Sequence, residues 1–394
     1  MIVIKPYSHF QTLIDYNPFL CLNINMLHNF HRLHCLIVLL SIIFELNPIS
    51  TKSSVKNRTK HTWIKTKHDL LITLSKWPKT LTKTLELHVS NSNFKDIQQV
   101  FNLCANDKHA LPTPIEHSDF IFNQPNFCVK HTNLWILIVV HTHPSNKHKR
   151  DLIRGTWGSL NRVNNRKIGV LFFMGLSNNR EEQKVIEEEE RMHNDIVQRA
   201  FLEHYHNMTR KHLTIMEWIS TGYCNKVPYL VKVDDDTFID IFHLTSYLEN
   251  KQPQLNNSFY CSATANVKVK RPNLMKNSKW EITNKEFSDS VFPTYCEGFG
   301  YVMDMKLAPY LYWCSMFQSP IWIDDVYVTG ILAEILGIQR IPFQNGHGYA
   351  NLKPGREEGS LADSIFLLSL YNEFYPLTFH EMWRESVMYS MQID

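Results

Sequence analysis

The chain has 394 residues, of which 44% are hydrophobic and 12% are aromatic, so it can bury a substantial core in one large domain or two small ones. This composition excludes an intrinsically disordered protein. The 41 basic and 38 acidic residues leave a net charge of +3, which is too balanced to give an electrostatic argument for binding nucleic acid.

Eight cysteines are scattered along the chain, and no two of them form a Cys-x-x-Cys pair. The spacing therefore gives no support to a zinc finger or a thioredoxin-like site. Because the chain also has a hydrophobic N-terminal run and glycosylation sequons, we expect some of the cysteines to form disulfides. The pairing stays open at this level.

The N-terminal part contains one apolar run, from Leu33 to Phe44, with histidines and an arginine just ahead of it. A membrane-spanning helix needs about 20 apolar residues, so the core of a signal peptide competes here with a type II membrane anchor. We assign residues 33–46 to a signal anchor, and the basic flank places residues 1–32 in the cytoplasm. A true start at Met26 would put the run where such signals normally begin.

Residues 47–130 are rich in Lys, Thr, Ser and Asn, and we interpret them as a lumenal stem that is partly ordered towards its end. We expect a catalytic domain over residues 131–360 and a C-terminal extension of it over residues 361–394. Sequons for N-glycosylation begin at Asn57, Asn207 and Asn256.

The first part of the catalytic domain alternates between strand and helix patterns. A continuous apolar run from Leu134 to Val140 predicts a strand that is covered on both faces. Asp151 to Trp157 predicts the beginning of a helix, and Ile168 to Met174 a second strand. The glutamate-rich residues 181–191 have the spacing of an exposed helix, and a further helical stretch runs from Phe201 to Trp218. With the strand that follows, this order predicts an α/β fold with a mostly parallel central sheet.

That next strand, Tyr229 to Val233, ends in the consecutive carboxylates Asp234, Asp235 and Asp236. In open α/β sheets, ligands bind beyond the carboxyl ends of the strands. Three adjacent like charges near apolar walls repel one another unless a cation intervenes, and oxygen ligands favour Mg²⁺ or Mn²⁺ over zinc. An acidic run is usually a solvated loop, but the apolar strand ahead of this one favours a metal site.

Three further motifs lie in the second half of the chain. Tyr295 to Tyr301 combines Gly298 and Gly300 with aromatic residues, which suits a close approach of backbone to a sugar or nucleotide and is also common in turns. The pair Asp324-Asp325 precedes an apolar helical pattern, where acids ordinarily act as caps. His347 lies in a polar loop, where it either completes a metal site or has no function.

Six ordered motifs resemble those of the inverting β1,3-glycosyltransferase family, which includes β1,3-galactosyltransferases and β1,3-N-acetylglucosaminyltransferases of the Golgi. They are Ile153 to Gly158, Phe172 to Gly175, Asp195 to Lys211, Lys232 to Asp236, Tyr295 to Tyr301 and Asp324 to Gly330. The resemblance implies a GT-A type nucleotide-sugar-binding fold, a UDP-sugar donor, a glycan acceptor on a glycoprotein or glycolipid, and a Mn²⁺ cofactor. It also implies a single-pass type II protein of the Golgi membrane with a lumenal catalytic domain.

The resemblance further implies roles for individual residues. Asp325 would be the catalytic base, because inversion needs one carboxylate to take the proton from the attacking acceptor hydroxyl. Asp236 would bind the metal, with His347 as a second candidate ligand. The residues expected to bind the nucleotide sugar are Asp234, Asp235, Arg154, Gly298 and Gly300.

The expected function is the transfer of galactose or an N-acetylhexosamine to a glycan in β1,3 linkage with inversion. One alternative is a catalytically inactive relative that binds or chaperones an active transferase, although the carboxylates are intact. Another is a metal-dependent phosphohydrolase, which the Tyr295 to Tyr301 motif makes less favourable. The donor stays open, because Ile323 to Tyr327 favours the N-acetylglucosaminyl branch, whereas Tyr295 to Gly298 and Pro342 to Asn345 favour the galactosyl branch.

Overall fold

In the computed structural model, the described residues are 99–100, 103–105, 118–224, 226–251, 257–272, 279–343, 349–352, 366–369 and 375–393. All of them belong to the larger of two compact units of the chain, Thr62–Asp394. The expected anchor over residues 33–46, the sequons at Asn57 and Asn256, and His347 lie outside the described residues. Within those ranges, the model contains no helix that is long and apolar enough to cross a membrane.

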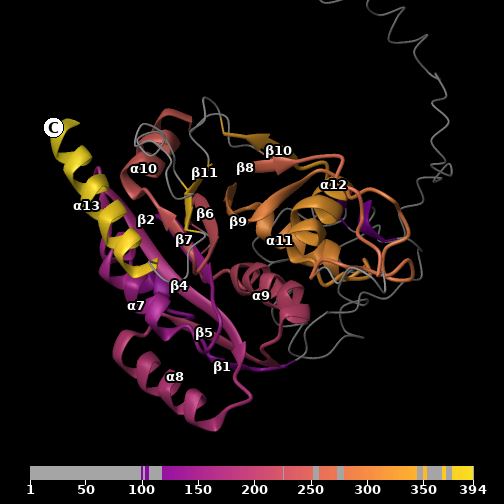
Figure 1. Cartoon of the computed structure of the whole chain (residues 1–394), viewed down its shortest axis with the longest axis horizontal. Helices are drawn as coiled ribbons and strands as arrows, with labels where there is room; N and C mark the ends of the chain where they lie inside the picture. Colours follow the sequence, from indigo (N-terminus) through magenta and orange to yellow (C-terminus); the bar gives the residue numbers. More distant parts are fainter. Residues whose placement is uncertain are drawn as a thin grey trace, which may run out of the picture. The chain divides into compact units, whose positions relative to one another are not determined.

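Among the described residues, a nine-stranded mixed sheet forms the centre of the fold, in the order β1-β5-β4-β2-β6-β9-β8-β10 with β3 beside β4 (Figure 1). Its strands are β1 Phe120–Phe122, β2 Leu134–His141, β3 Arg162–Val163, β4 Arg166–Leu176, β5 Ile196–Leu202, β6 Tyr229–Asp234, β8 Ser258–Thr264, β9 Tyr295–Asp304 and β10 Gln339–Pro342. Strands β5, β4, β2, β6, β8 and β10 run in one direction, and β1, β3 and β9 run against them. The predicted α/β fold with a mostly parallel sheet is therefore confirmed.

Helices cover both faces of this sheet. They are α6 Phe127–Lys130, α7 Lys147–Gly155, η2 Trp157–Ser159, α8 Arg180–His193, η3 Tyr205–Asn207, α9 Met208–Ser220, α10 Ile241–Lys251, α11 Leu307–Ser315, the π-helix η5 Val326–Leu332, α12 Ala333–Leu336 and α13 Tyr375–Ile393. A smaller sheet pairs β11 Tyr349–Leu352, β12 Phe366–Ser369 and β7 Thr237–Ile239 in that order.

Strand β2 contributes side chains to two hydrophobic cores, one on each face of the sheet. Leu137 and Val139 pack into one core with α9, α11 and η5, while Ile136 and Ile138 pack into the other with α7, α10 and α13. Figure 1 shows α9, α11 and α12 on one side of the sheet and α7, α10 and α13 on the other. Because side chains alternate along a strand, burial on both sides makes β2 a continuous apolar run, and the prediction for this strand is confirmed.

The helix predicted to begin at Asp151 begins earlier, at Lys147, and ends at Gly155. Lys147 Nζ and Asp151 Oδ2 form an ion pair at 2.5 Å, and pairs with this spacing stabilise a helical turn. Beyond Gly155 the backbone of Thr156 leaves helical geometry, with φ −123° and ψ −121°, and the Thr156 hydroxyl donates to Leu152 O at 2.8 Å. The predicted start of this helix was therefore wrong.

The helical stretch predicted from Phe201 to Trp218 is a strand followed by a helix. Strand β5 continues to Leu202, and α9 begins only at Met208. Ile196 and Val197 enter opposite cores, so both faces of β5 contribute apolar side chains. A short apolar run of this kind does not reveal by its period whether it is strand or helix, which is why the prediction for Phe201 was wrong.

Three disulfides join distant parts of the fold, which confirms the expectation that some cysteines pair. They are Cys104–Cys314, Cys128–Cys224 and Cys261–Cys296. The first two attach residues ahead of 131 to α11 and to the turn that follows α9, and β1 pairs with β5. The folded unit thus takes in residues that precede 131, the expected beginning of the catalytic domain.

Candidate active site

The site is built where β2 and β6 end beside each other. His141 ends β2 and is paired in register with Asp234, which ends β6. The apolar residues of β6, which are Tyr229, Leu230, Val231 and Val233, are buried in the two cores. Asp234 at the end of the strand is therefore the first position where β6 can present a carboxylate. The turn after Asp234 is held against β9, because the Thr237 hydroxyl donates to Phe299 O at 3.0 Å.

Asp235 is the buried member of the three consecutive carboxylates, with 8% of its side chain exposed. Its donors are Thr142 Oγ1 at 2.7 Å, Asn146 Nδ2 at 2.8 Å and Lys149 Nζ at 3.0 Å. Both carboxylate oxygens are thus bonded to groups on the loop and helix that follow β2. Asp235 fixes the acidic turn to this loop, and its expected contact with a nucleotide sugar stays a prediction.

Asp236 is the open member of the three, with 45% of its side chain exposed. The nitrogen of Lys149 lies 3.9 Å from its Oδ2. Burial, together with the neighbouring charge of Asp234, raises the pKa of Asp236 to about 6. A carboxylate whose ionisation is opposed by like charges gains most from a bound cation.

Lys232 places a positive charge inside the strand that leads to these acids. Its side chain is buried, and Nζ donates to Asp234 Oδ1 at 2.6 Å and to Gly298 O at 2.5 Å. Burial opposes the charge, but Asp234 and Asp324 outweigh that effect and raise the pKa of Lys232. The sequence signal for this role is a lysine inside an otherwise apolar strand.

Asp324 is held as a buried anion by a histidine. Burial lowers the pKa of His212, so the imidazole is neutral at neutral pH. Its Nδ1 then donates to Asp324 Oδ2 at 2.9 Å, and its Nε2 accepts from the Tyr301 hydroxyl at 2.7 Å. His141 lies between the acids, with Nδ1 3.9 Å from both Asp234 Oδ1 and Asp324 Oδ2. Sequence reasoning missed both histidines, because neither lies in an acidic motif.

Asp325 opens the π-helix η5, and its Oδ1 accepts from Val326 N at 2.7 Å. Its Oδ2 faces Gly298, where an added Cβ would lie 3.4 Å away. Burial and the charge of Asp324 raise the pKa of Asp325 to about 7. A carboxylate whose pKa is close to neutral pH is suited to take up a proton during a reaction.

The expected glycines differ in their position relative to this carboxylate. The backbone oxygen of Gly298 accepts from the amine of Lys232, and a Cβ added to Gly298 would lie 3.4 Å from Asp325 Oδ2. Gly300 lies two residues further along β9 and pairs with Val233 of β6. The structure therefore brings Gly298 to the acids directly, whereas Gly300 belongs to the strand pairing that supports them.

Arg154 lies in an ion-pair network away from the acidic turn. Its guanidinium donates to both oxygens of Asp195, at 2.9 and 2.8 Å, and to Glu189 Oε1 at 2.7 Å. It also lies 4.7 Å from the centroid of the Phe172 ring. The pocket beside it is lined by residues 168–170 near the beginning of β4, whereas the carboxylates follow the ends of the neighbouring parallel strands. The expected nucleotide contact of Arg154 stays a prediction.

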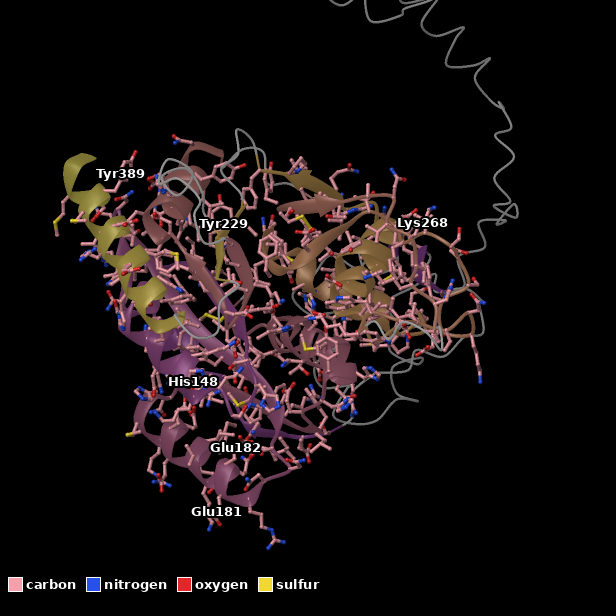
Figure 2. The ribbon with its side chains drawn as sticks, in the orientation of Figure 1. His148, Glu181, Glu182, Tyr229, Lys268 and Tyr389 are labelled. Atoms are coloured by element: carbon pink, nitrogen blue, oxygen red, sulfur yellow. A yellow bond between two sulfur atoms is a disulfide. The ribbon has the colours of Figure 1, made fainter. Side chains whose placement is uncertain are left out.

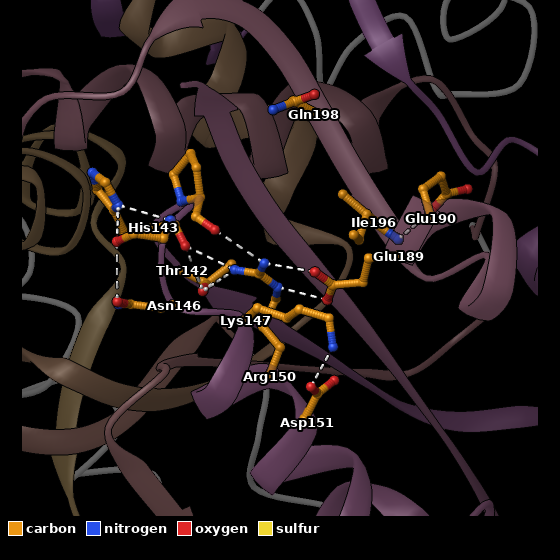
Figure 3. Close-up of polar contacts among 12 residues, drawn as sticks. Thr142, His143, Asn146, Lys147, Arg150, Asp151, Glu189, Glu190, Ile196 and Gln198 are labelled. Carbon is orange, nitrogen blue, oxygen red and sulfur yellow. Dashed lines mark hydrogen bonds and ion pairs between the residues drawn. The ribbon is translucent and has the colours of Figure 1, made fainter. Parts of the chain in front are cut away.

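A second arginine connects this network to the site (Figure 3). Arg150 and Glu189 are both fully buried and form a bidentate pair, with N–O distances of 2.8 and 2.7 Å. Arg150 also donates to Thr142 Oγ1 at 3.3 Å and to His143 O at 2.7 Å. Since Thr142 in turn donates to Asp235, this buried pair supports the loop that holds the acidic turn.

Within the described ranges, no three His, Cys, Asp or Glu side chains are arranged to hold a metal ion by themselves. Cations that act on nucleotides are typically held by one or two carboxylates and completed by substrate phosphates and water. Asp236 offers an open carboxylate with a raised pKa, and Asp234 lies beside it. These residues fit a divalent cation that binds together with a diphosphate.

The sequon at Asn207 begins at the last residue of η3 and continues into α9. Asn207 Nδ2 donates to Leu202 O at 2.9 Å. Thr209, the third residue of the sequon, is buried, and its hydroxyl donates to Ile321 O at 2.5 Å. Glycosylation of Asn207 stays a prediction.

Comparisons with known proteins place the chain in a family. A family model described as Galactosyltransferase matches residues 148–344. The chain is 31% identical over 227 residues to the mouse protein Beta-1,3-galactosyltransferase 1, covering 58% of this chain and 67% of that protein. It is 29% identical over 313 residues to the human protein Beta-1,3-galactosyltransferase 2, and this match covers 77% of this chain and 72% of that protein. Among solved structures, a glycosyltransferase that glycosylates the major capsid of PBCV-1 gives a TM-score of 0.34 at 9% identity, covering 63% of this chain and 98% of that one.

Proposed function

The chain belongs to the Galactosyltransferase family, and we propose that it transfers galactose from UDP-galactose to a hydroxyl of a glycan acceptor, in β1,3 linkage and with inversion. We infer that its α/β fold is of the GT-A type, as the resemblance in the motifs implies. The observation that carries the proposal is the position of Asp325, a carboxylate with a pKa of about 7 that lies beside Gly298 at the acidic site. The names of the related proteins support galactose and the β1,3 linkage.

The reaction uses Asp325 as its base. The acceptor hydroxyl gives its proton to Asp325, and its oxygen bonds to the anomeric carbon from the face opposite the diphosphate. The bond between that carbon and the diphosphate oxygen breaks, and UDP leaves with the bonding electrons. Buried Lys232 draws Asp234 and Gly298 together, and so holds the acidic turn against the strand that lies beside Asp325.

We propose Mn²⁺ as the cofactor, held by Asp236 with Asp234 beside it. When bound, the cation neutralises the charge that develops on the departing diphosphate. Asp235 contributes by holding the turn in place through its bonds to Thr142, Asn146 and Lys149. The raised pKa of Asp236 is the feature of this chain that supports a cation there.

We propose that the protein is a single-pass type II protein of the Golgi membrane, with its catalytic domain in the lumen. The three disulfides support an oxidising compartment, because such bonds persist mainly in secretory organelles and outside the cell. The intact carboxylates at Asp236 and Asp325 support catalysis over the alternative of an inactive binding partner.

The proposal is tested by UDP release from the purified full chain. UDP-galactose, UDP-N-acetylglucosamine and UDP-N-acetylgalactosamine are each supplied with β-linked galactoside and N-acetylglucosaminide acceptors, with Mn²⁺ and with a chelator. We expect UDP release only from UDP-galactose, stimulated by acceptor and abolished by the chelator. Turnover of another donor overturns galactose, and release of free sugar without acceptor favours a hydrolase.

A further inference from the structure

Four aromatic side chains form an exposed cluster, which we call the aromatic platform. Its members are Tyr205 and His206 of η3, Trp280, and Trp322. The two tryptophan rings are nearly parallel, at 5° with centroids 6.1 Å apart, and His206 stacks on Trp322 at 4.7 Å. Tyr205 lies 5.6 Å from each tryptophan ring. Tyr205 and Trp280 are each 38% exposed and Trp322 is half-buried, so the cluster lies at the surface of the molecule.

The platform lies next to the proposed base. Trp322 precedes Asp325 by three residues in the loop that leads into η5. The hydrogen bond from Thr209 to Ile321 O ties this loop to the beginning of α9, directly after η3. Burial raises the pKa of Tyr205, and the largest electrostatic contributions come from Asp324 and then Asp325, so the phenol lies within reach of their charge.

The chemistry of the platform suits a pyranose ring. One face of a hexopyranose such as galactose presents several C–H groups with a small positive charge, and the face of an aromatic ring carries the complementary negative charge. Lys279 lies above two of the rings, with Nζ 4.9 Å from the Trp280 centroid and 5.9 Å from that of Tyr205. Its ammonium group lies over the faces of these rings, where it can donate to the hydroxyls of a sugar bound beside it.

The position of the platform along the site indicates whether it binds the donor sugar or the acceptor sugar. The diphosphate end is marked by Asp236 and Lys149, which lie after β6 and on α7. The acceptor must bring a hydroxyl to Asp325, and the platform adjoins the loop that carries this residue. A sugar stacked on the platform therefore approaches the base from the acceptor side.

We propose that the aromatic platform is the acceptor subsite, where the apolar face of the acceptor hexopyranose stacks on Trp322 and Tyr205 so that its hydroxyl reaches Asp325. The inference rests on the proposed transferase function and deepens it, because it names the surface that selects the acceptor.

The test compares acceptor and donor kinetics of full-chain variants. We expect Trp322→Ala to raise the KM for methyl N-acetyl-β-D-glucosaminide by about tenfold or more, because an aromatic stack is removed. The KM for UDP-galactose should stay within about twofold. Trp322→Phe keeps an aromatic face and should restore most of the acceptor affinity. An unchanged acceptor KM, or an equal rise in both KM values, overturns the proposal.

Tyr389→Ala is the matched control for Tyr205→Ala. Tyr389 is 42% exposed on α13, at the left edge of Figure 2, and it likewise contacts a histidine ring, that of His243. We expect Tyr205→Ala to weaken acceptor binding and Tyr389→Ala to leave both KM values unchanged. If Trp322→Ala fails to fold, as judged by circular dichroism, the Tyr205→Ala result decides the matter alone.

A binding measurement separates failure of the subsite from failure of the proposed function. The intrinsic tryptophan fluorescence of the full chain is titrated with methyl β-D-galactoside, methyl N-acetyl-β-D-glucosaminide and lactose, without donor. If no UDP-sugar is turned over but a glycoside binds and Tyr205→Ala abolishes its binding, the transferase proposal fails and the platform stands. Binding that Tyr205→Ala leaves intact, or no binding of any glycoside, overturns the platform.

Discussion

At the scale of single residues, Asp325 is under two opposing influences. Burial and, after it, the charge of Asp324 raise its pKa, whereas the hydrogen bond from Val326 N and the amine of Lys232 lower it. We expect Asp325→Asn to lower kcat by at least about 10²-fold, because the amide cannot take the acceptor proton. UDP-galactose binding, measured by calorimetry with Mn²⁺, should persist.

Glu181→Gln provides the control for this change. Glu181 is an exposed carboxylate on α8, at the bottom of Figure 2, and its side chain is 78% exposed. Its loss should leave kcat unchanged. A fully active Asp325→Asn enzyme would remove Asp325 as the base.

The pH dependence of the reaction follows from the same residue. The pKa of Asp325 is raised from its ordinary value to about 7, so the group is protonated below that pH and ionised above it. A protonated carboxyl cannot accept the proton of the acceptor hydroxyl. We therefore expect kcat/KM to fall about tenfold for each pH unit below 7 and to level off above it. A flat profile from about pH 5 to 8 would contradict this assignment.

Sequence reasoning found the acids of the site more readily than the groups that hold them. Asp236 and Asp325 stand out because each follows or precedes an apolar pattern. Lys232, His212 and Arg150 were not predicted as parts of the site, because their roles depend on partners 66, 112 and 39 residues away. Such contacts are made by the fold and leave no local pattern.

At the scale of elements, the π-helix η5 positions the base through its contacts with β9. The Thr329 hydroxyl donates to Asp325 O at 2.6 Å and accepts from Cys296 N at 2.9 Å. A Cβ on Gly330 would lie 3.1 Å from Pro293 Cγ and 3.2 Å from Tyr295 Cβ. The helix can approach the strand this closely only because residue 330 has no side chain.

Gly330→Val should therefore push η5 away from β9. We expect it to lower the free energy of unfolding by about 1–3 kcal/mol and to reduce kcat by moving Asp325, with donor binding largely retained. Gly155→Ala is the control, because a Cβ there meets no atom within 4 Å and should change stability by less than about 1 kcal/mol. Urea denaturation and steady-state kinetics measure both effects, and wild-type kcat in Gly330→Val would contradict the role of η5.

The order of the central elements could be predicted because strands β2, β4 and β6 are apolar on both faces and are separated by amphipathic helices. The π-helix could not, since its apolar pattern from Val328 to Leu336 also fits an ordinary helix. Strand β9 was not predicted either, because its glycines suggested a turn. Its strand form depends on pairing with β6 and β8, which are distant in the chain.

At the scale of the whole molecule, we expect different disulfides to contribute to stability and to catalysis. Cys104–Cys314 joins residues 210 apart and ties the segment ahead of the sheet to α11. Cys261–Cys296 joins residues 35 apart on the paired strands β8 and β9, and Cys296 lies two residues before Gly298. The first bond therefore constrains the longer part of the unfolded chain, whereas the second lies close to the site.

Replacing each pair by alanine should show this division. We expect loss of Cys104–Cys314 to lower the free energy of unfolding by about 2–5 kcal/mol with kcat nearly unchanged below the unfolding transition. Loss of Cys261–Cys296 should cost less stability, because it closes a shorter loop, but it should lower kcat, because the backbone that touches Asp325 is released. Urea denaturation and UDP release measure the two effects. The reverse pattern, with kcat lost only in the Cys104/Cys314 variant, would show that the site depends on the segment ahead of the sheet and not on the pairing of β8 with β9.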